Sequence, residues 1–283
     1  RLCGLIVDTP TSRYNPNRAA CATTSTALLV FEDTVDKFKP IQGGTGRGEM
    51  APYSDVDLMF LTAAKPSPED GEAAEAILHL LWDLKLKVGH SLRSIDELIA
   101  LAKTDVTVRT ALLEARLLWG EEALFDAAMR RFRKEIAAGT AAEFVAAKLA
   151  ERDARHVRMG DSRYVVEPNV KEGKGGLRDL HLLFWIAEYL YRVHEPSELV
   201  AKGVLTKEEA RHFERAERFF WSVRFLLHLA ADRAEERMSF AHQRELATAL
   251  NYADRPGKSA VERFMHFYFL NAKTVGDLTG VFL

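Results

Sequence analysis

The amino-acid sequence predicts an α+β protein in which a small sheet comes first and an all-helical bundle follows. Polar and apolar residues alternate from 55 to 58, and the run stays apolar to 61, which fits the two-residue period of a half-buried strand. Beyond residue 105 the apolar residues recur mostly at intervals of three and four, the period of amphipathic helices. With 283 residues and 47% hydrophobic content, the chain is long enough to bury a large core and to form two domains.

Residues 1–40 show no strong pattern. They include Pro10, Pro16 and several Asn, Ser and Thr residues, so we expect an irregular segment there. Residues 22–38 have a weak helical period. Residues 40–42 are expected to form a short strand that leads into a glycine-rich turn.

The clearest strand follows that turn. Its two-residue period directs Asp55 and Asp57 to one face, and Val56, Leu58 and Phe60 to the other. The first face is therefore expected to be acidic and exposed to water, and the second to belong to the core.

Three further elements complete the predicted sheet region. Apolar spacing predicts a helix over 73–81, and residues 84–88 predict a third strand with Gly89 and His90 at its end. Ser94–Glu97 has the pattern of a capping box, which predicts that a helix begins there. A lone histidine is more often a hydrogen-bonded structural residue than a catalyst, and this is the preferred interpretation of His90.

The rest of the chain predicts helices, two of them announced by capping boxes at Thr206–Glu209 and Ser259–Glu262. Four other helices are expected over 107–119, 121–138, 141–159 and 177–193. The predicted organisation is an irregular segment over 1–40, an α/β domain over 41–105 and a helical domain over 106–283.

Composition gives no support to several classes of partner and site. The net charge of −2 provides no field that would favour nucleic acid or an anionic membrane, so neither is an expected partner. Cys3 and Cys21 have neither the spacing of a zinc site nor that of a disulfide framework, which indicates reduced thiols. No apolar run approaches the ~20 residues of a membrane span, so we expect a cytoplasmic protein.

The stretch GGTGRGEMAPYSDVDL, residues 43–58, carries the candidate chemistry. It lacks the lysine and hydroxyl of a P-loop, and its glycines do not match the dinucleotide-binding pattern. What it offers is a bare backbone that can approach an anion, with Arg47 as a charged donor and Ser54 beside the acids. Asp55 and Asp57 supply hard oxygen ligands for Mg²⁺, with Mn²⁺ as an alternative. Two solvated acids on an exposed strand are the competing interpretation.

Together the glycine turn and the acid pair resemble the signature of the DNA polymerase β-type nucleotidyltransferases, which implies a mixed sheet. The resemblance narrows to the bacterial PII uridylyltransferase / uridylyl-removing family. Four stretches carry it, in order: GGTGRGEMAPYSDVDLMFL, LLWDLKLKVGHSLRSIDEL, ALLEARLLWG and VVEPNVKEGKGGLRDLHLLFWIA. It implies transfer of UMP from UTP to a tyrosine of the PII signalling protein when glutamine is low, with Mg²⁺ and release of pyrophosphate.

The resemblance also implies roles for individual residues. Asp55 and Asp57 would be catalytic metal ligands, and Asp83, before the expected third strand, is the candidate for a third catalytic acid. Asp83 at a helix end is the alternative. The nucleotide-binding candidates, from the turn and from a basic loop before a helix, are Gly43, Gly44, Arg47, Gly48, Ser54, Lys174 and Arg178.

Lys174 and Arg178 have a competing interpretation as part of a solvated loop. Asp179 beside them is a further candidate for binding the triphosphate or a partner. Thr45 stands where the family usually has an aromatic residue, which puts the stacking of the nucleotide in question.

Two other functions stay open at this point. One is an adenylyltransferase of the type that modifies glutamine synthetase, and the other is a catalytically silent module that binds PII. Full-length members of the family continue into an HD hydrolase domain and two ACT domains. This sequence contains no His-Asp dipeptide, so the uridylyl-removing domain is expected to lie outside it.

Overall fold

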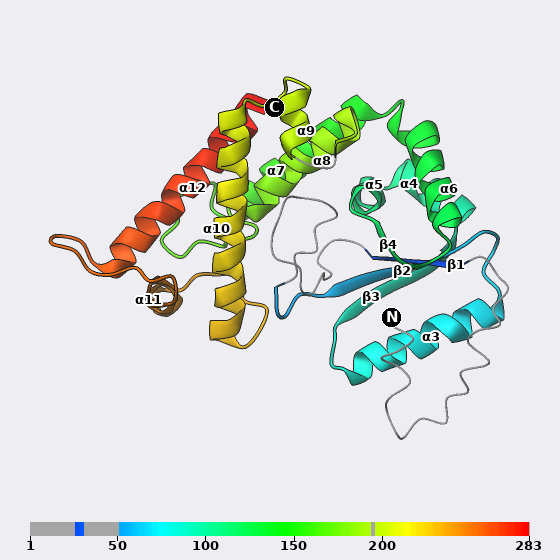
Figure 1. Cartoon of the computed structure of the whole chain (residues 1–283), viewed down its shortest axis with the longest axis horizontal. Coiled ribbons are helices and arrows are strands. Elements are labelled where there is room, and N and C mark those ends of the chain that lie inside the picture. The colour runs from blue at the N-terminus through cyan, green and yellow to red at the C-terminus, as the bar shows by residue number, and fades with distance from the viewer. Residues whose placement is uncertain (1–25, 31–50, 194–195, 283) are drawn as a thin grey trace.

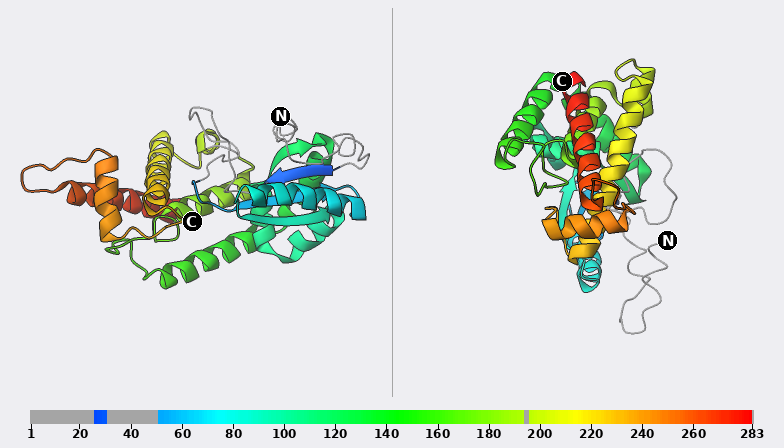
Figure 2. Two further views of the ribbon diagram at one scale, coloured as in Figure 1. Left: turned by 90° about the horizontal axis from the view of Figure 1, so that it is seen from below. Right: turned by 90° about the vertical axis from the view of Figure 1, so that its left-hand side faces the viewer.

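The computed structural model describes residues 26–30, 51–193 and 196–282. A sheet with its covering helices forms one part, and a bundle of helices forms the other (Figure 1). Figure 2 shows that the molecule is elongated, with the sheet toward one end and the last two helices toward the other. The predicted α+β class is confirmed.

The sheet has four strands in the order β3-β2-β1-β4. β2 and β3 are parallel, whereas β1 is antiparallel to both β2 and β4. The sheet is therefore mixed, as predicted. The strands are β1 (Thr26–Val30), β2 (Val56–Thr62), β3 (Val88–Ser94) and β4 (Arg116–Gly120).

β1 corrects one prediction. Residues 22–38 were expected to be helical, but residues 26–30 form a strand. β1 lies between β2 and β4 and pairs with both along its length. Hydrogen bonds on two edges outweigh a weak local period, since secondary-structure propensity is only a small bias.

A second correction concerns residues 107–119. The helix there is short, α5 (Val106–Leu113), and β4 follows it and pairs with β1. β4 thus extends the sheet beyond residue 105, the predicted end of the first domain. The domain limits themselves stay a prediction.

The third strand begins later than expected. α3 (Pro68–Asp83) starts at a capping box formed by Ser67 and Asp70 and continues to Asp83. Lys85 then adopts a positive φ of 62°, which reverses the chain, and β3 begins at Val88 rather than at residue 84. The short basic and apolar stretch that suggested a strand is a turn.

Helices cover the sheet on both faces, so the predicted water-exposed face is limited to its edge. Val56, Leu58 and Phe60 pack against α3, whereas Met59 and Leu61 are buried on the opposite face. α4 (Ile95–Thr104) and α6 (Glu122–Phe132) cover that opposite face. Met59 and Leu61 share the face of Asp57 but are buried, so only the acids at the start of this face are exposed to water.

The helical half is built around long helices, and its predicted capping boxes at Thr206 and Ser259 are confirmed. A π-helical turn (Arg133–Ala137) joins α6 to this half. Its helices are α7 (Ala141–Arg158), α8 (Leu177–Tyr191), α9 (Pro196–Ala201), α10 (Lys207–Ala231), α11 (Phe240–Ala249) and α12 (Ala260–Phe282).

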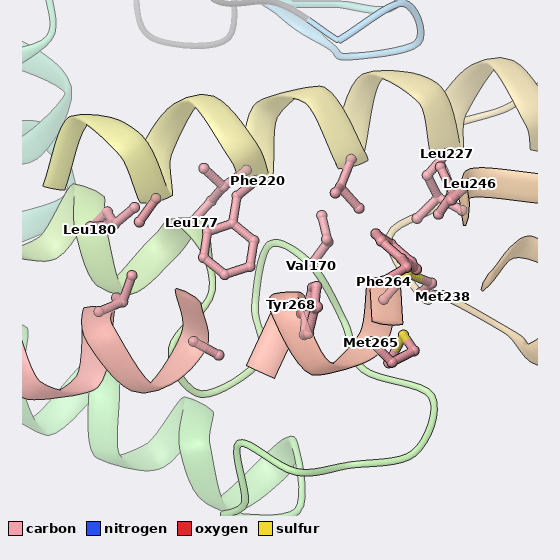
Figure 3. Packing of buried hydrophobic residues seen from close by; sticks show 14 of the residues in the cluster. Val170, Leu177, Leu180, Phe220, Leu227, Met238, Leu246, Phe264, Met265 and Tyr268 are labelled. Carbon is pink, nitrogen blue, oxygen red and sulfur yellow. The ribbon is translucent and has the colours of Figure 1, made fainter. Parts of the chain in front are cut away.

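Phe220 of α10 and Tyr268 of α12 meet edge to face in the core of this half, with ring centroids 5.3 Å apart. Leu177 of α8 belongs to the same buried cluster, which Figure 3 shows. α8 also contributes Trp185 and Ile186 to the core that lies against the sheet. One almost wholly buried helix therefore belongs to both cores and joins the two halves.

Candidate active site

Asp55 directly precedes β2 and Asp57 is its second residue, at the end of the strand that is still exposed to water. Both side chains are exposed, and Val56 between them is buried against α3. The N–H of Val56 donates to the carbonyl oxygen of Lys87 at 2.7 Å, so the strand is already held against the chain that leads into β3. Two acids are thus carried on a fixed backbone at the exposed end of a buried strand.

Gly89 makes room for the second acid. In the parallel pairing of β2 and β3, Asp57 lies opposite Gly89. A Cβ atom at position 89 would lie 2.3 Å from Oδ1 of Asp57, much closer than van der Waals contact. A glycine within a strand often marks such a close approach. The position of the Asp57 carboxylate therefore depends on the absence of a side chain at residue 89.

This pair of acids fits a magnesium ion. Carboxylate oxygens are the ligands that Mg²⁺ prefers, and Mg²⁺ in nucleotide sites is often held by one or two carboxylates together with water and substrate phosphates. Within the residues described by the structure, no group of three or more His, Cys, Asp or Glu side chains is arranged to hold a metal. Two acids on β2, with space kept open by Gly89, agree with that mode of binding.

The glycine turn cannot be placed beside these acids, because Gly43, Gly44, Arg47 and Gly48 lie outside the described residues. Ser54 is described. Its N–H donates to the carbonyl oxygen of Ala51 at 3.0 Å, and its Oγ accepts a hydrogen bond from Nη2 of Arg224 at 3.3 Å. The predicted nucleotide-binding serine therefore contacts α10 of the helical half.

Asp83 and His90 are not grouped with the acid pair. Asp83 is the exposed last residue of α3 and forms no three-residue metal group with Asp55 and Asp57. His90 pairs with Leu58, so it lies on the sheet face covered by α3, opposite to the face of Asp57. Its ring meets that of Trp82 edge to face, with ring centroids 6.2 Å apart. A catalytic role for Asp83 stays a prediction.

The basic loop before α8 is tightly packed. Lys174 forms an ion pair with Asp161 at 2.7 Å, and Arg178 forms one with Glu172 at 3.2 Å. Gly175 has a φ of +81°, and a Cβ there would lie 2.3 Å from the carbonyl oxygen of Ala272 in α12. This glycine is required by the packing of the loop against α12. Nucleotide binding by Lys174 and Arg178 stays a prediction.

Asp179 holds this loop to α7. Its carboxylate accepts from the N–H of Gly175 at 2.7 Å, lies 2.9 Å from Nε2 of His156 and pairs with Arg155. Burial alone would raise the pKa of Asp179, but the hydrogen bond with His156 and the charge of Arg155 outweigh it, and the pKa is lowered. Asp179 is therefore an ionised, buried link between the loop and α7.

We expect Asp179→Asn to lower the free energy of unfolding by about 3–5 kcal/mol at neutral pH, because it leaves buried Arg155 without its nearest charged partner and with only Glu172 at 3.9 Å. Because the folded-state pKa is depressed, the contribution of Asp179 is present above the unfolded value near 4 and is lost as the pH falls through the lower folded value. The difference between variant and parent should therefore narrow in acid. Urea denaturation at several pH values measures it.

Asp161→Asn is the matched control, since Asp161 is an exposed acid paired with Lys174 in the same region. We expect that change to cost less than about 1 kcal/mol. Equal losses for the two variants would contradict the role assigned to Asp179.

A cavity of about 360 Å³ lies elsewhere, between the end of α7 and the end of α12. Lys174, Asp179 and Gly276 are among its lining residues, and neither acid of β2 is. The guanidinium group of Arg163 lies over Gly276, where a Cβ would meet it at 2.6 Å. This cavity belongs to the packing of the helical half rather than to the acid pair.

Sequence reasoning missed the contacts that α10 makes beside the acids. Tyr53 donates its hydroxyl hydrogen bond to Asp232, and Arg224 reaches Ser54. The signal that could have found Arg224 is its position among apolar residues of α10, since a charged side chain on a core-facing stripe usually has a buried partner. Its partner is Glu236.

The chain is similar to known proteins over both the sheet and the helical half. Residues 143–283 match the family model described as GlnD PII-uridylyltransferase. A bifunctional uridylyltransferase/uridylyl-removing enzyme of Novosphingobium aromaticivorans is 63% identical over 241 residues, which is 85% of this chain and 26% of that relative. The chain belongs to this family. Any stretch of 241 residues in a chain of 283 includes Asp55 and Asp57, so the likeness extends over the acid pair as well as the helices.

Other members of the PII-uridylyltransferase family give the same picture. Bifunctional uridylyltransferase/uridylyl-removing enzymes of Rhodopseudomonas palustris and Azospirillum brasilense are 58% identical over 239 residues and 55% identical over 240 residues, respectively. The chain spans about 26% of the length of each of these relatives. Across residues 26–30, 51–193 and 196–282, no helix is both long and apolar enough to cross a bilayer.

Proposed function

We propose that this chain transfers UMP from UTP to a tyrosine of the PII signalling protein and releases pyrophosphate. The observation that carries the proposal is the acid pair of β2, exposed at the end of a buried strand with Gly89 leaving space beside Asp57. Membership of the PII-uridylyltransferase family supports UMP as the transferred group and PII as the acceptor.

Asp55 and Asp57 would hold Mg²⁺, or Mn²⁺ in its place. When bound, such an ion neutralises charge on the phosphates and favours attack on the α-phosphorus. The residues of the chain provide position: β2 is fixed by its pairing with β1 and β3, and the two carboxylates are carried by that strand. The tyrosine oxygen forms a bond to the α-phosphorus, the bond to the β-phosphate breaks, and the hydroxyl proton leaves to solvent.

Calorimetry tests nucleotide binding directly. We expect UTP to bind in the presence of Mg²⁺ and to lose most of its affinity when EDTA removes the metal, because the two acids alone repel the triphosphate. ATP is the comparison, and we expect it to bind more weakly. Tighter binding of ATP would favour an adenylyltransferase, and no metal-dependent binding of either nucleotide would favour a silent module that binds PII.

Incorporation of labelled UMP into purified PII tests the reaction itself. A PII variant with phenylalanine in place of the acceptor tyrosine is the matched control, and it should remain unlabelled. The uridylyl-removing activity named for the relatives is proposed to reside in a part of those proteins that this chain does not cover, the HD hydrolase domain. A cytoplasmic location is proposed on the same family membership.

A further inference from the structure

The helical half contacts the segment that carries the first acid. Nη2 of Arg224 donates to Oγ of Ser54, a residue separated from it by 170 positions in the sequence. The hydroxyl of Tyr53 donates to Asp232, separated by 179 positions. Ser54 directly precedes Asp55. The loop that leads into β2 therefore lies beside the end of α10, as Figure 1 also shows.

Arg224 is held from behind by a buried network. Its side chain is 2% exposed, and its Nε lies 3.0 Å from Oε1 of Glu236. The guanidinium carbon also lies 4.9 Å from the ring centre of Trp221. Burial raises the pKa of Glu236, but the His228 hydrogen bond and the charge of Arg224 outweigh it, and the pKa is lowered. Glu236 is therefore ionised, and its ion pair with Arg224, together with the ring of Trp221, fixes the orientation of the guanidinium group.

The segment on the other side is also fixed, except at Asp55. The Ser54 N–H is bonded to Ala51, which is fully buried, and the Val56 N–H is bonded to Lys87. The ion pair with Glu236 is enough to join α10 to the loop that follows it. Arg224 contacts Ser54 as well, one residue before the first acid of the candidate site.

We propose that Arg224 is a positioning residue, which holds Ser54 and so sets the direction of the Asp55 carboxylate relative to Asp57. This inference rests on the proposed function. Arg224 itself touches neither of the reacting groups. It makes the geometry of the acid pair depend on the helical half, because a movement of α10 moves the backbone on which Asp55 stands.

A double-mutant cycle with Ser54→Ala and Arg224→Lys tests the proposal. Lysine keeps a positive charge beside Glu236 but lacks the fork that reaches two partners. We expect each single change to lower kcat about 10- to 100-fold, the effect of a slightly misplaced site, with the KM for UTP within about twofold. The Mg²⁺ concentration for half-maximal rate should rise. The double variant should be no slower than the slower single variant, since both changes break one contact.

Direct binding of the nucleotide by Ser54 makes a different prediction. Ser54→Ala would then raise the KM for UTP, and its effect would multiply with that of Arg224→Lys, which would overturn the proposal. Arg233→Lys is the matched control, because Arg233 is an exposed arginine just beyond the end of α10, and its replacement should leave the rate unchanged.

Amide hydrogen exchange provides a readout that does not need activity. Exchange at residues 54–57 should become faster in both single variants, while exchange in α12 stays as in the parent protein. Unchanged exchange at residues 54–57 would overturn the positioning role even if UMP transfer is observed. Faster exchange in a chain that does not transfer UMP would instead place the failure in the proposed function.

Discussion

Asp57→Asn is expected to lower UMP transfer by at least about 100-fold, because it removes one of two negatively charged oxygen ligands from the candidate metal site. The carboxylate is exposed, so the change in the free energy of unfolding without metal should stay within about 0.5 kcal/mol. Steady-state rates with labelled UTP and PII, together with urea denaturation, measure both quantities.

The matched control for this prediction is Asp126→Asn. Asp126 is an exposed acid on α6 that pairs with Arg130 within the same helix. Its replacement should leave the rate unchanged. Full activity of Asp57→Asn at saturating UTP and Mg²⁺ would contradict the assignment of the acid pair and leave only the family membership as support.

Gly89→Ala is expected to lower the rate roughly 10- to 100-fold although residue 89 touches no substrate in the proposed reaction. A methyl group there meets Oδ1 of Asp57 at 2.3 Å, whereas Cγ of the same side chain is 3.6 Å away. The end of the Asp57 side chain can rotate away, so the fold should persist while the carboxylate loses its position. Rate measurements and circular dichroism on the same preparation separate the two effects.

Gly71→Ala offers a matched control for the added methyl group. Gly71 lies within α3, and a Cβ there meets nothing within 4 Å. Alanine should raise the free energy of unfolding by about 0.5–1 kcal/mol, since glycine is a poor helix former, and should leave the rate unchanged. A rate for Gly89→Ala equal to that of Gly71→Ala would contradict the link between Gly89 and Asp57.

Local patterns predicted the parts of the fold that depend on local physics. The capping boxes at Ser94 and Thr206 begin helices as expected, because a side chain that bonds to the backbone three residues later acts within one turn. The alternation in β2 also appears in its burial up to Leu58. β1 and β4 escaped prediction because their hydrogen bonds come from strands far away in the sequence.

The candidate site shows the same division. The spacing of Asp55 and Asp57 is visible in the sequence because the two residues are separated by one position, at the start of one strand. The contact between Arg224 and Ser54 joins residues 170 positions apart, and no local period contains that information. The close approach of Gly89 to Asp57 likewise depends on the register between β2 and β3. The sequence pattern predicts each strand separately and does not give that register.

The central place of β1 in the sheet has a consequence for how the protein is made. β1 is synthesised before its neighbours, but one of its edges is completed only when β4 has left the ribosome, after α3, α4 and α5. At ordinary rates of translation this interval lasts several seconds. An unpaired strand edge is a template for association with other chains, so this edge of β1 is open to such association during that interval.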